Sequence, residues 1–353
     1  MMALVPSSYK KEDVTILLKD ISGMVEPLPT EQREKLIQSG THYCEMLPIE
    51  YNPSEEYLKL YEYALENFSQ VTADAVKTVS EKIYCENKNP VLVSLARAGL
   101  PAGIMIKHYL EKKYNITVPH YAVSIIRGVG IDKNAMEYIL ERHNGKDLRF
   151  VDGWTGKGAI QNQLNEALKY YPQIDGRLAV IADPARITPF CGTHDDFLIA
   201  SSCLNSTASG LISRTFFRRD IITKNDFHGA VYYGELIDND KSYEFISAIE
   251  EKINFDTEIQ FASDEYTKGI DEIKKIGEDF GISDINLIKP GIGETTRVLL
   301  RRVPYKILIA ENCESRYVSH ILRLADEKNV TIQSYPLKRY RCCGIIKNMP
   351  TDA

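Results

Sequence analysis

Apolar residues recur along this chain in two patterns, one typical of helices and one typical of buried strands. Between residues 53 and 84 they return every three or four positions, which predicts one or two amphipathic helices. From residue 90 onward, helical stretches alternate with the strand-like runs VLVSLA, HYAVSII, LRFVD and LAVIAD. Strands joined by crossover helices form a parallel sheet. We therefore expect an α/β domain over residues 46–260, preceded by an irregular N-terminal extension over residues 1–45.

A second, smaller alternation follows a predicted linker at residues 259–268. Three helical stretches (IDEIKKIGEDFG, ETTRVLLRR and SRYVSHILRLADEKN) alternate with the strand-like runs INLIKP, YKILIAEN, VTIQSYP and CCGIIK. Helices on both sides of a short sheet make a small α/β/α sandwich. Residues 268–350 are expected to form this second domain.

Charge is distributed unevenly between the two predicted domains. Residues 289–347 carry twelve Lys/Arg against five Asp/Glu, a net +7, while the whole chain carries −6 and the remainder therefore −13. A basic module on an acidic body indicates a polyanionic partner for that module. The chain has no apolar run long enough for a membrane helix. Its seven cysteines and the lack of a signal-peptide pattern lead us to expect reduced thiols in the cytoplasm.

A strand–turn–helix junction at residues 91–103 could hold an anion. The turn Arg97-Ala98-Gly99 follows the strand, and Pro101 begins the helix. Backbone N–H groups and the positive end of the helix dipole would face a ligand in this turn. Gly99 permits close approach, and Arg97 could form paired hydrogen bonds to phosphate.

A second junction of the same kind lies at residues 148–160. Asp152 ends the strand at the carboxyl edge of the sheet, where open α/β sheets bind ligands. The turn offers four potential phosphate ligands: Thr155, Gly156, Lys157 and Gly158. Neither turn has the spacing of the two best-known nucleotide motifs, and glycines also occur at such turns for steric reasons alone. Two successive junctions with charged residues nevertheless favour a ligand site.

These junctions resemble the pyrophosphate loop and the phosphoribosyl-pyrophosphate loop of type I phosphoribosyltransferases. The whole chain is similar to a bacterial family found with tellurium-resistance and stress-response genes. That family joins a phosphoribosyltransferase-like domain to a Pelota-type RNA-binding domain, and its members are often labelled cysteine protease StiP. The similarity rests on VSLARAGLPAG, SIIRGVGIDKNAM, FVDGWTGKGAI, CGTHDDFLIASSCLNSTASGLISRTF and IKPGIGETTRVLLRRVPYKILI.

The resemblance implies a type I phosphoribosyltransferase-like sheet domain and an enzyme that uses Mg²⁺-bound phosphoribosyl pyrophosphate to make an N-ribosyl product. Asp152 would hold the ribose hydroxyls, residues 155–158 the 5′-phosphate and residues 97–99 the pyrophosphate. Arg127 would begin the mobile loop that closes over the substrate. Residues near the acceptor would be Trp154, Asp183, Cys191, His194, Asp195 and Asp196. Gly153 stands where that superfamily has a second acidic residue. We expect no metal ion held by the protein alone, and a homodimer is one possible assembly.

Cys191 belongs to a cluster that suggests a different chemistry. Within six residues the chain places this thiol, the imidazole of His194 and the carboxylates of Asp195 and Asp196. A cysteine hydrolase needs a thiolate beside an imidazole. Recognition of an acceptor and ordinary loop structure are the alternatives.

The segment from Lys289 to Arg297 resembles the Gly-x-Asn-Glu-x-x-Lys signature of the kink-turn-binding ribosomal-protein and Pelota superfamily. Gly293 replaces its asparagine and Arg297 replaces its lysine. The resemblance implies RNA contacts from Lys289, Gly291, Gly293, Glu294, Thr295, Arg297, Arg301 and Arg302. A solvated basic face is the alternative.

Three functions thus remain open. The first is the phosphoribosyltransferase coupled to RNA binding. The second is a regulator that senses a nucleotide and binds RNA without catalysis. The third is a cysteine hydrolase that uses Cys191.

Overall fold

The computed structural model describes residues 3–257, 259 and 269–347. Most of the predicted linker at residues 259–268 and the last residues of the predicted second domain lie outside the described residues. No helix in the described part of the chain is both long and apolar enough to cross a membrane.

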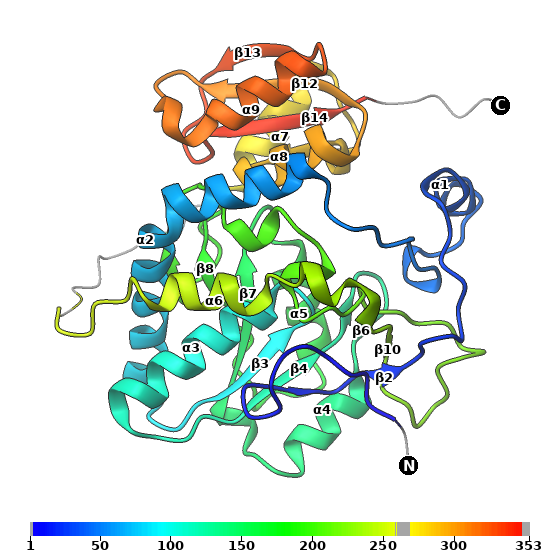
Figure 1. Cartoon of the computed structure of the whole chain (residues 1–353), viewed down its shortest axis with the longest axis vertical. Helices are drawn as coiled ribbons and strands as arrows, with labels where there is room; N and C mark the ends of the chain where they lie inside the picture. The colour runs from blue at the N-terminus through cyan, green and yellow to red at the C-terminus, as the bar shows by residue number, and fades with distance from the viewer. Residues whose placement is uncertain (1–2, 258, 260–268, 348–353) are drawn as a thin grey trace.

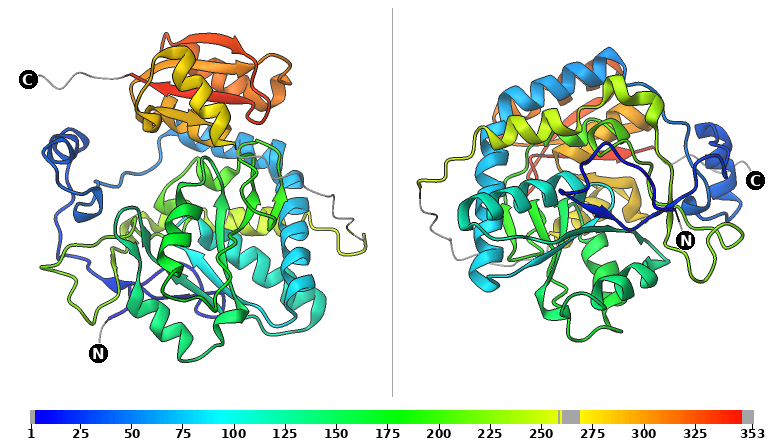
Figure 2. Two further views of the ribbon diagram at one scale, coloured as in Figure 1. Left: turned by 180° about the vertical axis from the view of Figure 1, so that it is seen from behind. Right: turned by 60° about the horizontal axis from the view of Figure 1, so that its bottom comes forward.

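The first domain is built around a six-stranded parallel sheet with the order β1-β4-β3-β7-β8-β9 (Figures 1 and 2). Its strands are β1 (Thr15–Ile16), β3 (Val91–Leu95), β4 (His120–Val123), β7 (Leu148–Trp154), β8 (Ala179–Ala182) and β9 (Cys191–Thr193). The central strands β3 and β8 are buried along their whole length, as expected for parallel strands covered on both faces. The edge strand β1 comes from the segment expected to be an N-terminal extension.

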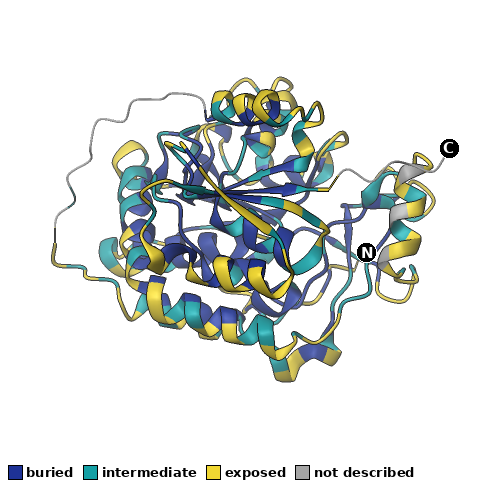
Figure 3. Ribbon diagram, turned by 90° about the horizontal axis from the view of Figure 1, so that it is seen from above, coloured by how far each residue is buried: buried dark blue, intermediate teal, exposed yellow. Residues whose placement is uncertain are grey.

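Helices cover both faces of this sheet. One face carries α2 (Glu55–Glu86), α3 (Gly99–Tyr114) and α6 (Ser242–Glu250), and the other carries α4 (Lys133–Leu140) and α5 (Ala159–Leu168). Outside these layers lie α1 (Thr30–Gln38) and two small ladders, which pair β2 (Lys19–Asp20) with β10 (Gly229–Ala230) and β5 (Ile125–Ile126) with β6 (Gly130–Ile131). Figure 3 shows the buried sheet beneath helices whose outer sides are exposed.

The C-terminal domain is a four-stranded sheet between two helical layers. The strand order is β11-β14-β12-β13, with β12 and β13 parallel and the other pairs antiparallel. The strands are β11 (Ile288–Pro290), β12 (Pro304–Ala310), β13 (Thr331–Tyr335) and β14 (Cys342–Ile346), and the helices are α7 (Ile270–Phe280), α8 (Ile292–Arg301) and α9 (Ser315–Glu327). Along β12, Leu308 packs in the cluster of α7, whereas Ile307 packs with α8 and α9. The predicted α/β/α layering of this domain is therefore observed.

The long helix α2 connects the two domains (Figure 1). Its N-terminal half lies under the C-terminal domain, where Tyr63 Oη donates a hydrogen bond to the carbonyl of Arg316 over 2.6 Å and Phe68 stacks on Tyr317. The apolar core of the first domain continues into α8 and α9. The chain is thus a mixed α/β protein with a parallel sheet, and its second domain is docked through a shared apolar core.

Candidate functional site

The two predicted phosphate turns lie side by side because β3 and β7 are neighbours in the sheet. Both turns line one cavity of about 520 Å³, which also reaches β11 and α8 of the C-terminal domain. Gly99 is required by this packing, because a Cβ atom at that position would lie 2.3 Å from the carbonyl oxygen of Val151. The convergence of the two turns follows from this close approach.

The arginine of the first turn is engaged by the protein itself. Arg97 donates hydrogen bonds to the carbonyl of Ile212 over 3.1 Å and to the side chain of Asn205 over 3.2 Å. Its neighbour Ala98 contributes to the cavity wall. The Arg97 side chain therefore braces the segment around residues 205–212 while it faces the cavity.

The second turn serves as a docking surface for the C-terminal domain. Lys157 Nζ donates to the carbonyls of Ile285 and Ile288 over 2.8 and 3.0 Å, and Tyr340 Oη donates to the carbonyl of Gly156 over 2.8 Å. Burial and the nearby Lys289 lower the pKa of Lys157 to about 8. Gly158 has a left-handed backbone conformation with φ +78° directly before α5. Two of the four residues predicted to surround a phosphate thus hold another part of the chain.

Asp152 lines the cavity and lies two residues before the end of β7. Burial raises the pKa of its carboxyl to about 7, although a hydrogen bond from the Gly153 amide and the positive charge of Arg297 act in the opposite direction. Two residues later, the Trp154 ring has the Arg297 guanidinium over it, 4.8 Å from the ring centre. Arg297 also pairs with Glu294 over 3.5 Å. A carboxyl that titrates near neutral pH inside a cleft marks a candidate functional site.

Most residues predicted to contact RNA face inward. Lys289, Glu294, Arg297 and Arg301 line the cavity between the domains. Thr295 is fully buried, and Gly291 and Gly293 lie against Asp196 and Trp154. Arg302 is exposed. In this docked arrangement the predicted RNA surface is largely a wall of the cavity, which sequence patterns within one domain could not show.

The second chemical cluster lies on the segment from β8 to β9. His194 Nδ1 lies 2.8 Å from the backbone carbonyl of Asp183, and a carbonyl can only accept, so Nδ1 carries the proton. The Sγ atom of Cys191 lies 3.6 Å from the other nitrogen, Nε2, and 3.8 Å from Nδ1. Cys191 is 1% exposed and the His194 side chain is 14% exposed. The thiol and the imidazole are therefore in contact, and the proton on Nδ1 is fixed by the Asp183 carbonyl.

Asp183 organises this cluster through its carboxylate as well as its carbonyl. Its side chain accepts hydrogen bonds from the amides of Ile187 and Thr188 over 2.6 and 2.9 Å and from the hydroxyl of Thr155. One carboxylate oxygen lies 3.9 Å from His194 Nδ1, close enough to stabilise an imidazolium. This orienting role was missed in the sequence, where the only signal is an aspartate at the end of a buried strand.

The same cluster has the donors of a metal site. Ligand atoms of Asp183, Cys191 and His194 all lie within 4.8 Å of one another. The expectation that the protein alone holds no metal stays a prediction.

Asp195 and Asp196 have a structural role at the domain interface. Asp196 is buried, and its carboxylate accepts hydrogen bonds from the amides of Ile292, at the start of α8, and Arg341, each over 2.8 Å. Asp195 pairs with the Arg341 guanidinium over 3.1 Å. The two residues predicted near an acceptor substrate therefore clamp the C-terminal domain to the segment that follows Cys191.

Comparison with known proteins identifies the family. Residues 7–250 match the family described as "Tellurite-like stress resistance cysteine protease StiP", and residues 267–348 match the "PELOTA RNA binding domain". The chain belongs to the StiP family. A protein of Acinetobacter baylyi (strain ATCC 33305 / BD413 / ADP1) named "Cysteine protease StiP" is 34% identical over 364 residues, which cover 97% of this chain and 94% of that protein.

One solved structure also shows a weak likeness. It is titled "Crystal Structure of a Hypothetical Protein from Neisseria gonorrhoeae with bound ppGpp" and has 19% identity and a TM-score of 0.22. The match covers 32% of this chain and 65% of that chain. A likeness at this level supports no statement about the fold or a ligand here.

These findings confirm the family and correct the activity expected from the sequence. The StiP family and the relative are both named as cysteine proteases, so the predicted phosphoribosyltransferase and its transferase chemistry are wrong. The structure offers a physical reason, because Lys157 and Gly156 of the proposed phosphate turn bind the C-terminal domain instead. Magnesium was expected only with that substrate, and no observation tests it.

Proposed function

We propose that this chain is a thiol hydrolase of the cysteine-protease type, in which Cys191 is the nucleophile and His194 is its base. The observation that carries the proposal is the 3.6 Å approach of Sγ to Nε2 with Nδ1 held by the Asp183 carbonyl. The names of the StiP family and of the Acinetobacter relative support the same chemistry.

The arrangement is suited to transfer of an acyl group through a thioester. His194 Nε2 accepts the thiol proton, and the Cys191 thiolate attacks the substrate carbonyl carbon. Collapse of the tetrahedral intermediate breaks the C–N bond, and the imidazolium returns the proton to the leaving amine. Water then hydrolyses the thioester with the same imidazole as base. The Asp183 carboxylate stabilises the imidazolium that forms in each half of the cycle.

Site-resolved labelling with iodoacetamide tests this proposal. Cys203 is a matched control, because it is as buried as Cys191, and burial raises the pKa of its thiol to about 12. We expect Cys191 to react at least about tenfold faster than Cys203 and His194→Ala to remove the difference. Equal rates in the native protein, or a rate at Cys191 that is insensitive to His194→Ala, would contradict the proposal.

Hydrolysis itself provides the second measurement. Cys191→Ala should lower peptide-bond cleavage of an unfolded protein such as casein by at least about 100-fold, because the nucleophile is lost. Cys203→Ala should retain the activity. Cleavage that survives Cys191→Ala would exclude this thiol as the nucleophile.

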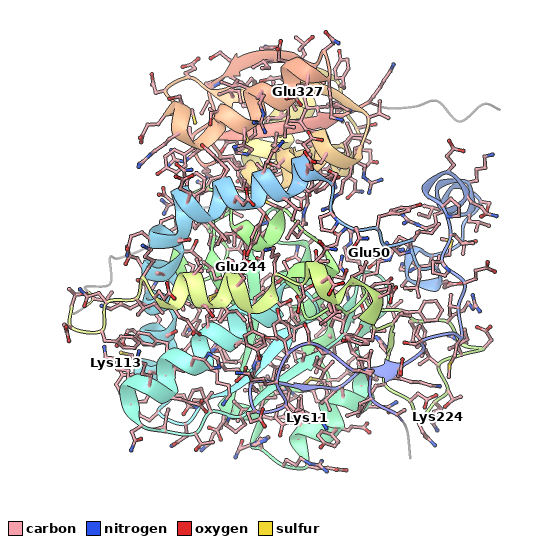
Figure 4. The ribbon with its side chains drawn as sticks, viewed as in Figure 1. Lys11, Glu50, Lys113, Lys224, Glu244 and Glu327 are labelled. Carbon is pink, nitrogen blue, oxygen red and sulfur yellow. The ribbon has the colours of Figure 1, made fainter. Side chains whose placement is uncertain are left out.

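RNA binding by the C-terminal domain is a second candidate function, and the match of residues 267–348 to the Pelota RNA-binding domain favours it. Arg302 is the predicted RNA contact that is exposed in the docked arrangement. Arg302→Gln should weaken binding of the full chain to RNA several-fold and make it less dependent on salt, since one phosphate contact is lost. Lys224→Gln is the control, because Lys224 lies at the edge of the first domain (Figure 4). Equal binding by both variants would exclude Arg302 from the RNA surface.

A further inference from the structure

The cluster around Cys191 brings three different metal-binding atoms together. Within residues 3–257, 259 and 269–347, it is the one group of at least three His, Cys, Asp or Glu side chains whose ligand atoms all lie within 4.8 Å of one another. Cys191 begins β9, His194 directly follows β9, and Asp183 directly follows β8. Because β8 and β9 are paired in the sheet, the backbone holds the three donors near one another.

The imidazole of His194 has the outer contact that is typical of a metal-bound histidine. Its Nδ1–H donates to the Asp183 carbonyl over 2.8 Å, so Nε2 is the nitrogen with the lone pair. Histidines that bind metals almost always donate their other ring N–H in this way, which fixes the tautomer. A tetrahedral zinc ion, with bonds of about 2.3 Å to sulfur and about 2.1 Å to nitrogen, holds these two ligands about 3.6 Å apart. The Sγ atom of Cys191 lies 3.6 Å from Nε2, so this separation suits one shared ion.

The carboxylate of Asp183 is held as a metal ligand is held. It accepts hydrogen bonds from the amides of Ile187 and Thr188 and from the hydroxyl of Thr155. Carboxylates that bind metals are oriented by outer contacts of this kind. An ionised carboxylate has about four acceptor positions, so three hydrogen bonds leave one for an ion.

We propose that Cys191, His194 and Asp183 bind a zinc ion through Sγ, Nε2 and one carboxylate oxygen. Sulfur and imidazole donors select zinc over magnesium and calcium, which prefer oxygen ligands alone. Binding releases the thiol proton and requires only rotations of side chains whose ligand atoms already lie within 4.8 Å. The His194 side chain is 14% exposed, and a water molecule completes the tetrahedron.

The bound ion inhibits the hydrolase, and this consequence rests on the proposed function. Zinc occupies the Cys191 thiolate and the Nε2 atom of His194, so neither the nucleophile nor its base remains for a substrate. Alkylation of Cys191 is blocked for the same reason, whether or not the protein hydrolyses anything.

Titration of the full chain with Co²⁺, after removal of metals with EDTA, tests the ligands directly. Cobalt takes the same N and S ligands, and a thiolate bound to it gives a charge-transfer band in the near ultraviolet. We expect one equivalent of Co²⁺ to produce this band and one equivalent of Zn²⁺ to remove it. Cys191→Ala should abolish the band, and His194→Ala should weaken binding at least about tenfold. Cys203→Ala is the matched control, because it removes another buried thiol and should keep the band. Circular dichroism checks that each variant is folded.

Labelling and hydrolysis separate this proposal from the hydrolase itself. One equivalent of Zn²⁺ should slow iodoacetamide labelling of Cys191 at least about tenfold and leave Cys203 unchanged. A cobalt band that persists in folded Cys191→Ala would overturn the metal site, and so would the absence of any band, which would uphold the expectation that the protein alone holds no metal. Zinc that binds and protects Cys191 in a protein without Cys191-dependent hydrolysis keeps the metal site and removes the hydrolase. Hydrolysis that depends on Cys191 but is unchanged by zinc does the reverse.

Discussion

The interdomain cavity and the Cys191 cluster are opposite kinds of site. The cavity has open volume and many charges, but its walls come from both domains, from Leu95 to Arg301. The cysteine cluster is assembled by one short segment, from Asp183 to His194, and is almost closed to solvent. Local chain geometry therefore brings this thiol and imidazole together, whereas the cavity depends on tertiary docking.

The two regions share one hydrogen bond. Thr155 lines the cavity, and its hydroxyl donates to the carboxylate of Asp183 in the cysteine cluster. This hydrogen bond joins the wall of the cavity directly to the cysteine cluster.

Asp183→Ala should have the largest effect and tests this link. The substitution leaves the amides of Ile187 and Thr188 and the Thr155 hydroxyl without their acceptor, so we expect the free energy of unfolding in urea to fall by about 3–5 kcal/mol. The reactivity of Cys191 should fall with it, because His194 loses its support. Asp238→Ala, at an exposed aspartate, is the control and should change stability by less than about 0.5 kcal/mol. A similarly small effect at Asp183 would mean that the segment from β8 to β9 holds its shape without this carboxylate.

The sequence predicted the parts of this comparison that depend on local patterns. The β-branched runs placed β3, β4, β7 and β8, and the neighbouring positions of β3 and β7 brought the two turns together. The Cys191–His194 pair was visible because its members are three residues apart. The two-residue strand β1 was missed, since so short a segment has no detectable periodicity.

Residues that depend on docking could not be predicted from the same patterns. Lys157 was expected to bind phosphate, but its ammonium is used by two carbonyls about 130 residues away in the C-terminal domain. Lys289, Arg297 and Arg301 were expected to contact RNA, which stays a prediction, and in the docked arrangement they line the cavity. The spacing of Arg297 and Arg301 indicates a charged helix face, but only the position of the second domain decides what that face contacts.

Asp196→Ala tests whether docking also controls access to Cys191, with a smaller expected effect. Asp196 accepts two backbone hydrogen bonds from the C-terminal domain and follows His194 by two residues. Their loss should cost about 2 kcal/mol and loosen the segment that covers the thiol. We expect iodoacetamide to label Cys191 about tenfold faster in the variant. Unchanged labelling would mean that the covering segment keeps its place without the clamp.

The pH dependence of the stability lost in Asp196→Ala distinguishes loss of the two hydrogen bonds from simple loss of packing. Burial raises the pKa of the Asp196 carboxyl to about 6. The folded protein therefore binds this proton more tightly than the unfolded chain, whose aspartates titrate near ~4. The stabilising contribution of the Asp196 carboxyl is complete below pH ~4 and declines as the pH rises through about 6. Asp196→Ala should consequently lower the free energy of unfolding by more at pH ~5 than at pH ~7.

Asp195→Ala is the adjacent control, because its half-exposed ion pair with Arg341 is worth at most about 1 kcal/mol. If the cost at Asp196 were larger at the higher pH, its charged form would be the one that holds the domains together.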